Sequence, residues 1–152
     1  MGDLAWLIVL MAAAHASGDI LLYSPYVAES KRVGSFLLRS WYVAKHVLIH
    51  VAFLWIWLWP YDVKLKISAS IYIFLVHYLI DISRTYYEPI FIDKDDFHIF
   101  SRKDISSCLF GNFVNRETRS FLKKHFKVWL GINMMDQSLH CASILIFAFW
   151  WF

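Results

Sequence analysis

The sequence predicts an all-α integral membrane protein, a four-helix bundle with a polar cytoplasmic segment between the third and fourth helices. Of its 152 residues, 59% are hydrophobic and 19% are aromatic. The hydrophobic residues form four blocks, each near the roughly 20 residues that cross about 30 Å of hydrocarbon as a helix. Each block also contains two polar residues spaced four apart, which predicts that the helices pack against one another.

The predicted helices cover 4–23, 38–59, 66–83 and 127–152 of a single domain, 1–152. The first could instead be a signal peptide, because "AAAHASG" offers small residues for cleavage. A signal begins with positive charge, however, and the only charge before this apolar run is Asp3. We interpret it as a permanent helix. The third helix is the shortest, and Lys64, Lys66 and Arg84 mark its ends, where long cationic side chains can reach the headgroups.

The distribution of lysine and arginine predicts the topology. Twelve fall in two of the connections, three of them after the first helix and nine after the third, whereas the connection after the second helix has only Lys64 and Lys66. Connections rich in basic residues stay in the cytoplasm. We therefore expect a protein of the cytoplasmic membrane with both termini outside.

Each predicted helix carries one pair of polar residues four positions apart. The pairs are His15 and Asp19, His46 and His50, His77 and Asp81, and Asp136 and His140. This spacing places both side chains on one helix face. At about 1.5 Å per residue, all four pairs lie roughly 7 to 16 Å from the cytoplasmic helix ends. We expect them to face one another in one layer, beside which Gly18 removes a side chain.

Five imidazoles and three carboxylates in one apolar layer favour a metal site. Ionisable side chains are costly at membrane depth and indicate function. Imidazole and carboxylate groups bind zinc, iron and manganese. We predict that the eight paired residues hold one or, more readily, two divalent ions, with zinc preferred, and that some of them support a ligand instead of binding directly.

Two other interpretations of the polar layer stay open. The four pairs could form a hydrogen-bonded network that rigidifies the bundle or relays protons. Haem needs only one or two axial histidines, which leaves the three aspartates unexplained. A ferritin-like di-iron centre uses glutamate, and none of the four predicted helices contains one.

Four segments, "HASGDILLYSPYVAESKR", "KHVLIHVAF", "VHYLIDISR" and "MDQSLH", resemble the successive signatures of a family of small bacterial and phage membrane proteins known as domain of unknown function 3307. The resemblance covers nearly the whole chain. It implies that the matching positions are family positions: His15, Gly18, Asp19, His46, His50, His77, Asp81, Asp136, Gln137 and His140. Lys31 is similar to the family's basic residue after the first helix, and Arg84 stands near a position where relatives place a basic residue. The family carries no established activity.

The polar segment 84–126 contains "NRETRSFLKKHFKVWL", which extends to 130 and reads either as an amphipathic helix capped by Asn115 with Glu117 in its first turn, or as a solvated lead-in to the fourth helix. We assign His98 and His125 to this surface. From Arg84 to Lys127, nine basic residues are offset by six acidic ones, so no nucleic-acid partner is expected. Cys108 and Cys141 have no spacing that suggests a disulfide framework or thiolate site.

Two functions are compatible with this site. In the first, the protein is a metal-dependent hydrolase of a lipid-like ester or phosphoester at the cytoplasmic leaflet. Asp19, Asp81 or Asp136 would then accept a proton, and Lys31, Arg84 and Gln137 would bind substrate. In the second, it is a non-enzymatic metal-handling or structural subunit of a membrane complex. Membrane lipids are the expected surroundings in both cases.

Overall fold

The computed structural model describes residues 2–21, 24–32, 34–93, 96, 98–100, 104 and 116–152. Within them lie four long helices, α1 (Gly2–Leu21), α3 (Phe36–Trp57), α4 (Val63–Phe91) and α6 (Arg116–Trp151), and one short helix, α2 (Pro25–Ser30). No strand occurs in this part of the chain. The all-α prediction is therefore confirmed.

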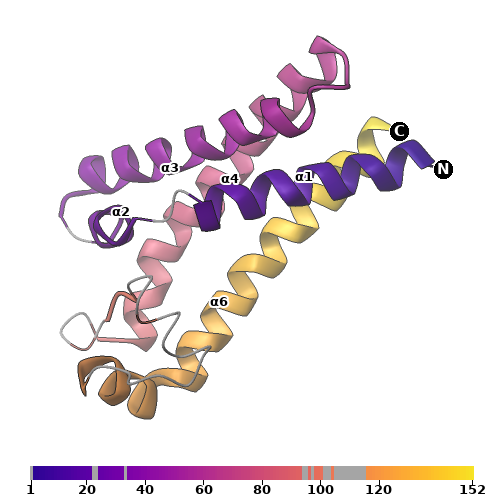
Figure 1. Cartoon of the computed structure of the whole chain (residues 1–152). Helices are drawn as coiled ribbons and strands as arrows, with labels where there is room; N and C mark the ends of the chain where they lie inside the picture. The colour runs from indigo at the N-terminus through magenta and orange to yellow at the C-terminus, as the bar shows by residue number, and fades with distance from the viewer. Residues whose placement is uncertain are drawn as a thin grey trace.

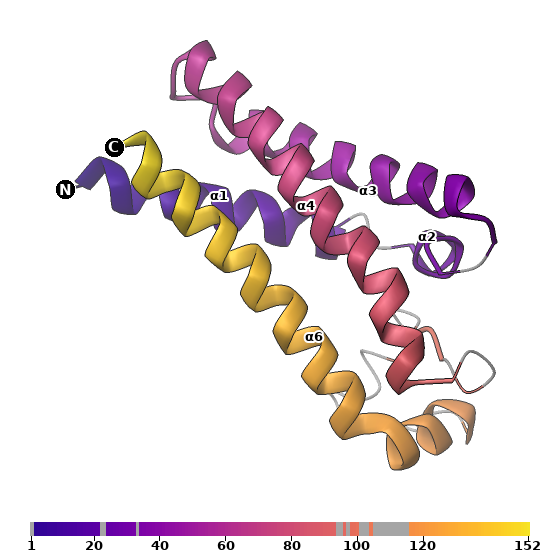
Figure 2. The same ribbon diagram turned by 180° about the vertical axis from the view of Figure 1, so that it is seen from behind.

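The four long helices pack in a ring. Both α1 and α4 contact α3 and α6. The two ends of the chain lie side by side, and the α3–α4 connection lies toward the same end of the molecule, opposite α2 (Figure 1; Figure 2). At the α2 end, α4 and α6 diverge from α1 and α3 (Figure 1). This arrangement places the described residues of the two basic connections toward one end of the bundle and Lys64 and Lys66 toward the other.

Local sequence signals fix where three of these helices begin. The Ser35 side chain accepts a hydrogen bond from the backbone N–H of Leu38 at the start of α3. The Asp62 carboxylate does the same for Leu65 at 2.9 Å at the start of α4. Such side-chain acceptors satisfy N–H groups that have no partner in the first helical turn. Helix α2 begins with Pro25, whose missing N–H costs nothing at that position.

The predicted end of the third helix at 83 is wrong, because α4 continues to Phe91. The apolar run stops near Ile82, but the buried face of the helix goes on through Thr85 and Glu88. This face is polar, so hydrophobicity does not reveal it. Pro89 lies in the last turn, and the helix ends two residues beyond it.

The predicted start of the fourth helix at 127 is also wrong, because α6 is one helix of 36 residues from Arg116. Of the two interpretations of the preceding segment, the structure shows the helix, which is continuous with the rest of α6 and has Glu117 in its first turn. Phe121 is buried in an apolar cluster with Ile92 and Phe100. The first turns of α6 bend away from its straight remainder (Figure 1). The expected cap, Asn115, and Cys108 lie outside the described residues.

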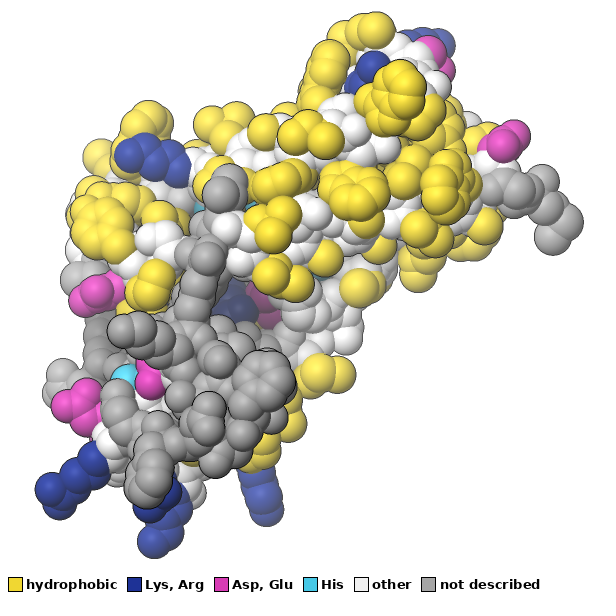
Figure 3. Space-filling model, in the orientation of Figure 1, with side chains coloured by type: hydrophobic (Ala, Val, Ile, Leu, Met, Phe, Trp, Pro, Cys, Tyr) yellow, Lys and Arg dark blue, Asp and Glu magenta, His cyan; other side chains and the backbone are white. Residues whose placement is uncertain are grey.

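An apolar core fills the half of the bundle nearest the chain ends. Its buried members come from all four long helices and include Leu7, Met11, Leu54, Leu65 and Phe147. Large apolar side chains are also exposed on the outer helix surfaces, and Figure 3 shows them spread over α1 and α3. Basic side chains project from the opposite end, where α6 begins (Figure 3).

Two of the described helices are long and apolar enough to span a membrane, Asp3–Leu21 and Val63–Phe91. By length α3 and α6 reach the same size, at 22 and 36 residues. Their mean hydropathy is lowered by the histidines and tryptophans of both helices and by Asp136 and Gln137 of α6. Length and composition alone therefore support membrane spanning by α1 and α4.

Candidate metal centre

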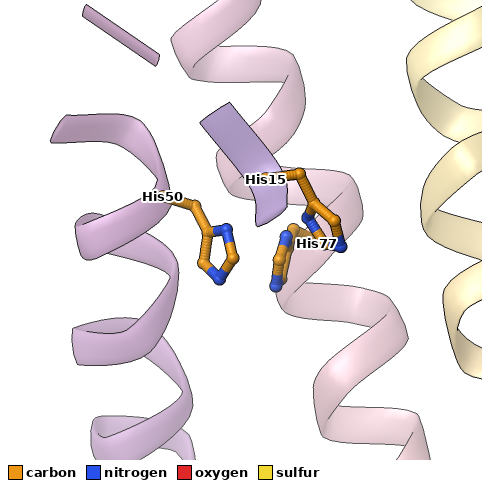
Figure 4. Close-up of side chains that lie close together, drawn as sticks. All are labelled: His15, His50 and His77. Atoms are coloured by element: carbon orange, nitrogen blue, oxygen red, sulfur yellow. The ribbon is translucent and has the colours of Figure 1, made fainter. Parts of the chain in front are cut away.

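The structure brings the five histidines of the polar pairs together in the middle of the bundle. The ring centroids of His77 and His140 are 4.1 Å apart, those of His50 and His77 are 4.2 Å apart, and those of His46 and His50 are 4.5 Å apart. His15 lies 4.8 Å from His140. Figure 4 shows His15, His50 and His77 converging from α1, α3 and α4. The expected convergence of the four helices at one layer is therefore observed.

Six of the eight predicted ligands form three overlapping triads with metal-binding geometry. The ligand atoms within each triad lie within 4.8 Å of one another. The triads are His15, His50 and His77; Asp19, His46 and His50; and His46, His77 and Asp81. Three histidines therefore occupy the centre, because each triad contains two of His46, His50 and His77 and adds one outer residue.

Asp19 faces three of these histidines. Its Oδ1 lies 3.3 Å from His50 Nε2 and 3.4 Å from His46 Nε2, and its Oδ2 lies 3.3 Å from His15 Nε2. Gln137 closes this group, since its Nε2 donates to Asp19 Oδ2 and its Oε1 lies 3.3 Å from His15 Nε2. Gln137 thus contacts two predicted ligands, while its predicted contact with substrate stays a prediction.

Asp81 is shared between the histidines and a lysine. Its Oδ2 accepts a hydrogen bond from Lys31 Nζ at 2.7 Å and lies 3.8 Å from His46 Nε2. Its Oδ1 lies 3.8 Å from His77 Nε2 and 3.7 Å from His140 Nε2. The 50-residue separation of Lys31 and Asp81 is closed because α2 folds back beneath the end of the bundle.

Asp136 and His140 lie beside the triads. Arg84 Nη1 donates to Asp136 Oδ2 at 2.9 Å, and His140 Nδ1 lies 2.9 Å from the backbone carbonyl oxygen of Asp136. That backbone contact leaves His140 Nε2 directed at the centre, 3.7 Å from Asp81. Their role as ligands stays a prediction, and the ion pair with Arg84 favours a supporting role for Asp136.

A charged network that the sequence did not suggest lies next to the histidines. The Glu88 carboxylate accepts hydrogen bonds from Arg32 Nε at 2.7 Å and from Arg84 Nη2 at 3.2 Å. Arg84 Nη2 also donates to Asn133 Oδ1 at 3.0 Å. Glu88 follows Asp81 by seven residues and Arg84 by four, so the helical spacing of α4, continued past its apolar part, would have identified it.

Several buried polar atoms at the centre have no hydrogen-bond partner. Among the described side chains these include His50 Nδ1, His140 Nε2 and Asp136 Oδ1. The side chains of His50 and His140 are each only 2–3% exposed. Buried polar atoms without partners are rare in native proteins, and they commonly mark the site of a water molecule or an ion. Of these three atoms, His140 Nε2 faces the centre, 3.7 Å from Asp81 Oδ1, whereas His50 Nδ1 faces Gly18 of α1.

A cavity of about 540 Å³ opens from the centre toward the α2 end. Its polar lining includes Asp19, Lys31, Arg32, His46, His77, Asp81, Arg84 and Glu88, and its apolar lining includes Ile49, Ile99, Phe100, Leu122, Phe126 and Trp129. On the other side of the histidines, only about 10 Å³ is open, next to Met11, Leu54 and Ile73. This space is about large enough for one water molecule. The apolar core therefore leaves no room for a larger molecule on this side of the histidines.

Gly18 allows the close packing of α1 against His50. A Cβ atom at position 18 would lie 2.5 Å from His50 Cε1 and Nδ1. Real Cβ atoms essentially never lie so close to another side chain, so the imidazole or the helix would have to move. The expected role of Gly18, to remove a side chain beside the site, is confirmed.

His98 and His125 lie in the region around the start of α6, as expected, and in none of the triads. His98 Nε2 is 2.8 Å from Thr118 Oγ1, and His125 Nε2 is 3.3 Å from Asp96 Oδ2. Hydrogen bonding to Lys124 and the adjacent His125 lowers the pKa of Asp96 below its ordinary value. These contacts stabilise the start of α6 against the residues before it.

A protein-family model described as "Protein of unknown function (DUF3307)" matches residues 7–152. The chain belongs to this family. The DUF3307 match includes all eight paired residues and all the residues that line the cavity. No curated protein and no solved structure matches the chain. Membership of the DUF3307 family thus agrees with the resemblance of the four signature segments and assigns no activity.

Proposed function

We propose that this protein is a membrane-embedded, metal-dependent hydrolase that cleaves a lipid-like ester or phosphoester at the cytoplasmic leaflet. The observation that carries the proposal is that all three members of the His46, His77 and Asp81 triad line the 540 Å³ cavity. A purely structural metal site is normally closed by its ligands, whereas a catalytic site keeps a position open to substrate. The cavity supports the hydrolase over a structural or metal-handling subunit.

We propose one divalent ion, with zinc preferred and iron or manganese as alternatives. Each pair of triads shares a histidine, so two neighbouring triads could be filled together only if one imidazole served both ions. An ion at two of the central histidines and one outer residue would have three protein ligands. Three ligands of this type leave one position for water, whose pKa a bound zinc ion lowers to about 7.

The remaining charged residues have distinct roles in this proposal. The Asp19 carboxylate lies next to three histidines and accepts a hydrogen bond from Gln137. It is the strongest candidate to accept a proton from a reacting water. If Asp19 accepts the proton, Asp81 is the carboxylate that binds the metal ion, together with His46 and His77. Arg84 and Lys31 border the cavity, where their positive charges would attract an anionic group of the substrate.

We also propose that all four long helices cross the membrane, with both termini outside. Helices α1 and α4 have the length and composition of spans, and α3 and α6 pack between them in the same ring. The closed apolar half of the bundle lies toward the chain ends, and the cavity lies at the basic end. This orientation places the cavity at the cytoplasmic interface, where a lipid headgroup can enter.

Metal content tests the proposed function most directly. Elemental analysis of the detergent-purified protein should find close to one zinc ion per chain, and His46→Ala and His77→Ala should each lose most of it, because each removes a ligand of the triad with Asp81 and of one other triad. His98→Ala and His125→Ala are matched controls outside the triads and should keep the metal. Wild-type protein without bound metal, and with thermal stability that chelator does not change, would contradict the metal site and with it the hydrolase.

Hydrolysis is tested separately on the zinc-loaded protein. Release of p-nitrophenol from p-nitrophenyl butyrate or bis(p-nitrophenyl) phosphate should be detectable for the wild type and His125→Ala, because His125 lies outside the triads and the cavity lining. It should fall to background for His77→Ala and after treatment with chelator. Full zinc occupancy without release from either ester, or equal release by His77→Ala, would favour the structural or metal-handling function instead.

Cysteine labelling tests the topology. In a background without Cys108 and Cys141, Lys64→Cys should react with a membrane-impermeant maleimide in intact cells, and Lys124→Cys should react only after permeabilisation. Both lysines are exposed, so access to the protein surface does not distinguish them. The reverse pattern would place the cavity at the outer leaflet.

A further inference from the structure

Lys31 neutralises a carboxylate that belongs to a metal-binding triad. Its Nζ donates to Asp81 Oδ2 at 2.7 Å, and the Lys31 and Asp81 side chains are only 15% and 9% exposed. Asp81 completes the triad with His46 and His77. The ammonium group therefore competes with a metal ion in that triad for the Asp81 carboxylate, and it is bound at Oδ2, the oxygen that lies 3.8 Å from His46 Nε2.

The other two cations of the cavity are held differently. Arg32 pairs with Glu88, and Arg84 pairs with Glu88 and Asp136. None of these carboxylates is a member of a triad. Metal binding at the histidines would leave both arginine pairs intact, so Lys31 is the cavity cation whose partner a metal ion would take.

If a metal ion takes Asp81, Lys31 needs another negatively charged partner. A buried ammonium group without a counter-ion is strongly unfavourable. Lys31, Arg32 and Arg84 all border the same cavity, and a divalent ion would add further positive charge there. A tetrahedral anion such as phosphate would satisfy the released ammonium group, and lysine binds phosphate as a point charge.

We propose that Lys31 is an exchangeable counter-ion, paired with Asp81 when metal is absent and released by metal binding to hold the phosphate group of a phosphate-bearing substrate. The inference rests on the proposed metal-dependent function and selects a phosphoester over a neutral ester. It implies that metal and phosphate bind cooperatively, because the metal ion supplies both its own charge and a free ammonium group.

Amine labelling of the wild-type protein tests the exchange without any substitution. Brief acetylation followed by mass spectrometry should find Lys31 protected in the metal-free protein. Labelling should rise several-fold with zinc and fall again when inorganic phosphate is added to the zinc-loaded protein. Lys45 is an exposed control on α3 and should label equally in all three states. Labelling of Lys31 that zinc does not change would overturn the proposal.

Zinc titration of Lys31→Met tests the competition. Removal of the competing ammonium group should tighten zinc binding about tenfold, while phosphate binding to the zinc-loaded variant should weaken about tenfold or more. Lys45→Met is the matched control and should change neither. Equal or weaker zinc binding by Lys31→Met would overturn the exchange.

The two proposals fail in different ways. If the proposed metal site is wrong, wild type and Lys31→Met will both lack zinc binding, and no labelling change will occur. If only the exchange is wrong, the wild type will bind zinc through its histidines while Lys31 keeps the same reactivity. Phosphate binding that is equally tight with and without zinc would also overturn the cooperativity.

Discussion

Arg84→Met should be among the most destabilising single substitutions in this protein. It would leave Asp136 without its arginine partner and remove one of the two arginines at Glu88. Removing one partner of a buried ion pair costs about 3–5 kcal/mol, because the other charge stays buried and uncompensated. Thermal unfolding in detergent should therefore show a large decrease in the midpoint temperature relative to wild type.

Two further variants make this expectation specific. Arg119→Met removes an exposed arginine near the start of α6 and should change stability little. In the double variant Arg84→Met with Asp136→Asn, the carboxylate at 136 is no longer charged, so part of the lost stability should return. A single Arg84→Met variant as stable as Arg119→Met would contradict a structural role for the network.

The sequence was sufficient to predict the helices and the convergence of their polar faces. Each of the four pairs is spaced by one helical turn, so a helix carrying His15 must place Asp19 on the same face. In an apolar environment these faces are buried only against each other. The helix face on which each of the eight side chains lies therefore follows from periodicity.

Helical spacing continued past the apolar run places Glu88 on the face of Asp81, but the partners of Glu88 could not be predicted in the same way. Glu88 and Arg84 follow the end of the apolar run, and the segment after Ile82 reads as solvent-exposed when hydrophobicity is the only signal. Burial of this part of α4 depends on α6 and on Arg32, which follows α2, and both come from distant parts of the sequence. Arg32 reaches Glu88 across 56 residues, and local periodicity contains no information on such a pair.

Candidate ligands can be distinguished from supporting residues only when the packing of the helices is known. Asp81 and Asp136 have the same spacing to a histidine in the sequence, yet Asp81 joins a triad and Asp136 pairs with Arg84. The difference arises from the helices next to each: α3 brings His46 to Asp81, and α4 brings Arg84 to Asp136. Sequence spacing fixes the face of a residue and leaves its neighbours undetermined.

Gly18→Ala should both destabilise the protein and weaken the metal binding that we propose. The added Cβ would lie 2.5 Å from two atoms of the His50 ring, which is buried and cannot turn away freely. Overpacking of this kind costs about 1–3 kcal/mol. His50 Nε2 lies 3.1 Å from Nε2 of His46, a member of the triad with Asp81, so displacement of His50 should disturb His46 and lower zinc affinity together with the unfolding temperature.

Gly131→Ala provides the matched control, because it is the same substitution within a helix. Nothing lies within 4 Å of a Cβ at position 131. Replacing glycine by alanine in an open helical position stabilises by roughly 0.5–1 kcal/mol, since alanine loses less backbone entropy on folding. The two variants should therefore shift the unfolding temperature in opposite directions, and only Gly18→Ala should lose zinc. If Gly18→Ala bound zinc as the wild type does, the position of His50 against α1 would not matter for the metal centre.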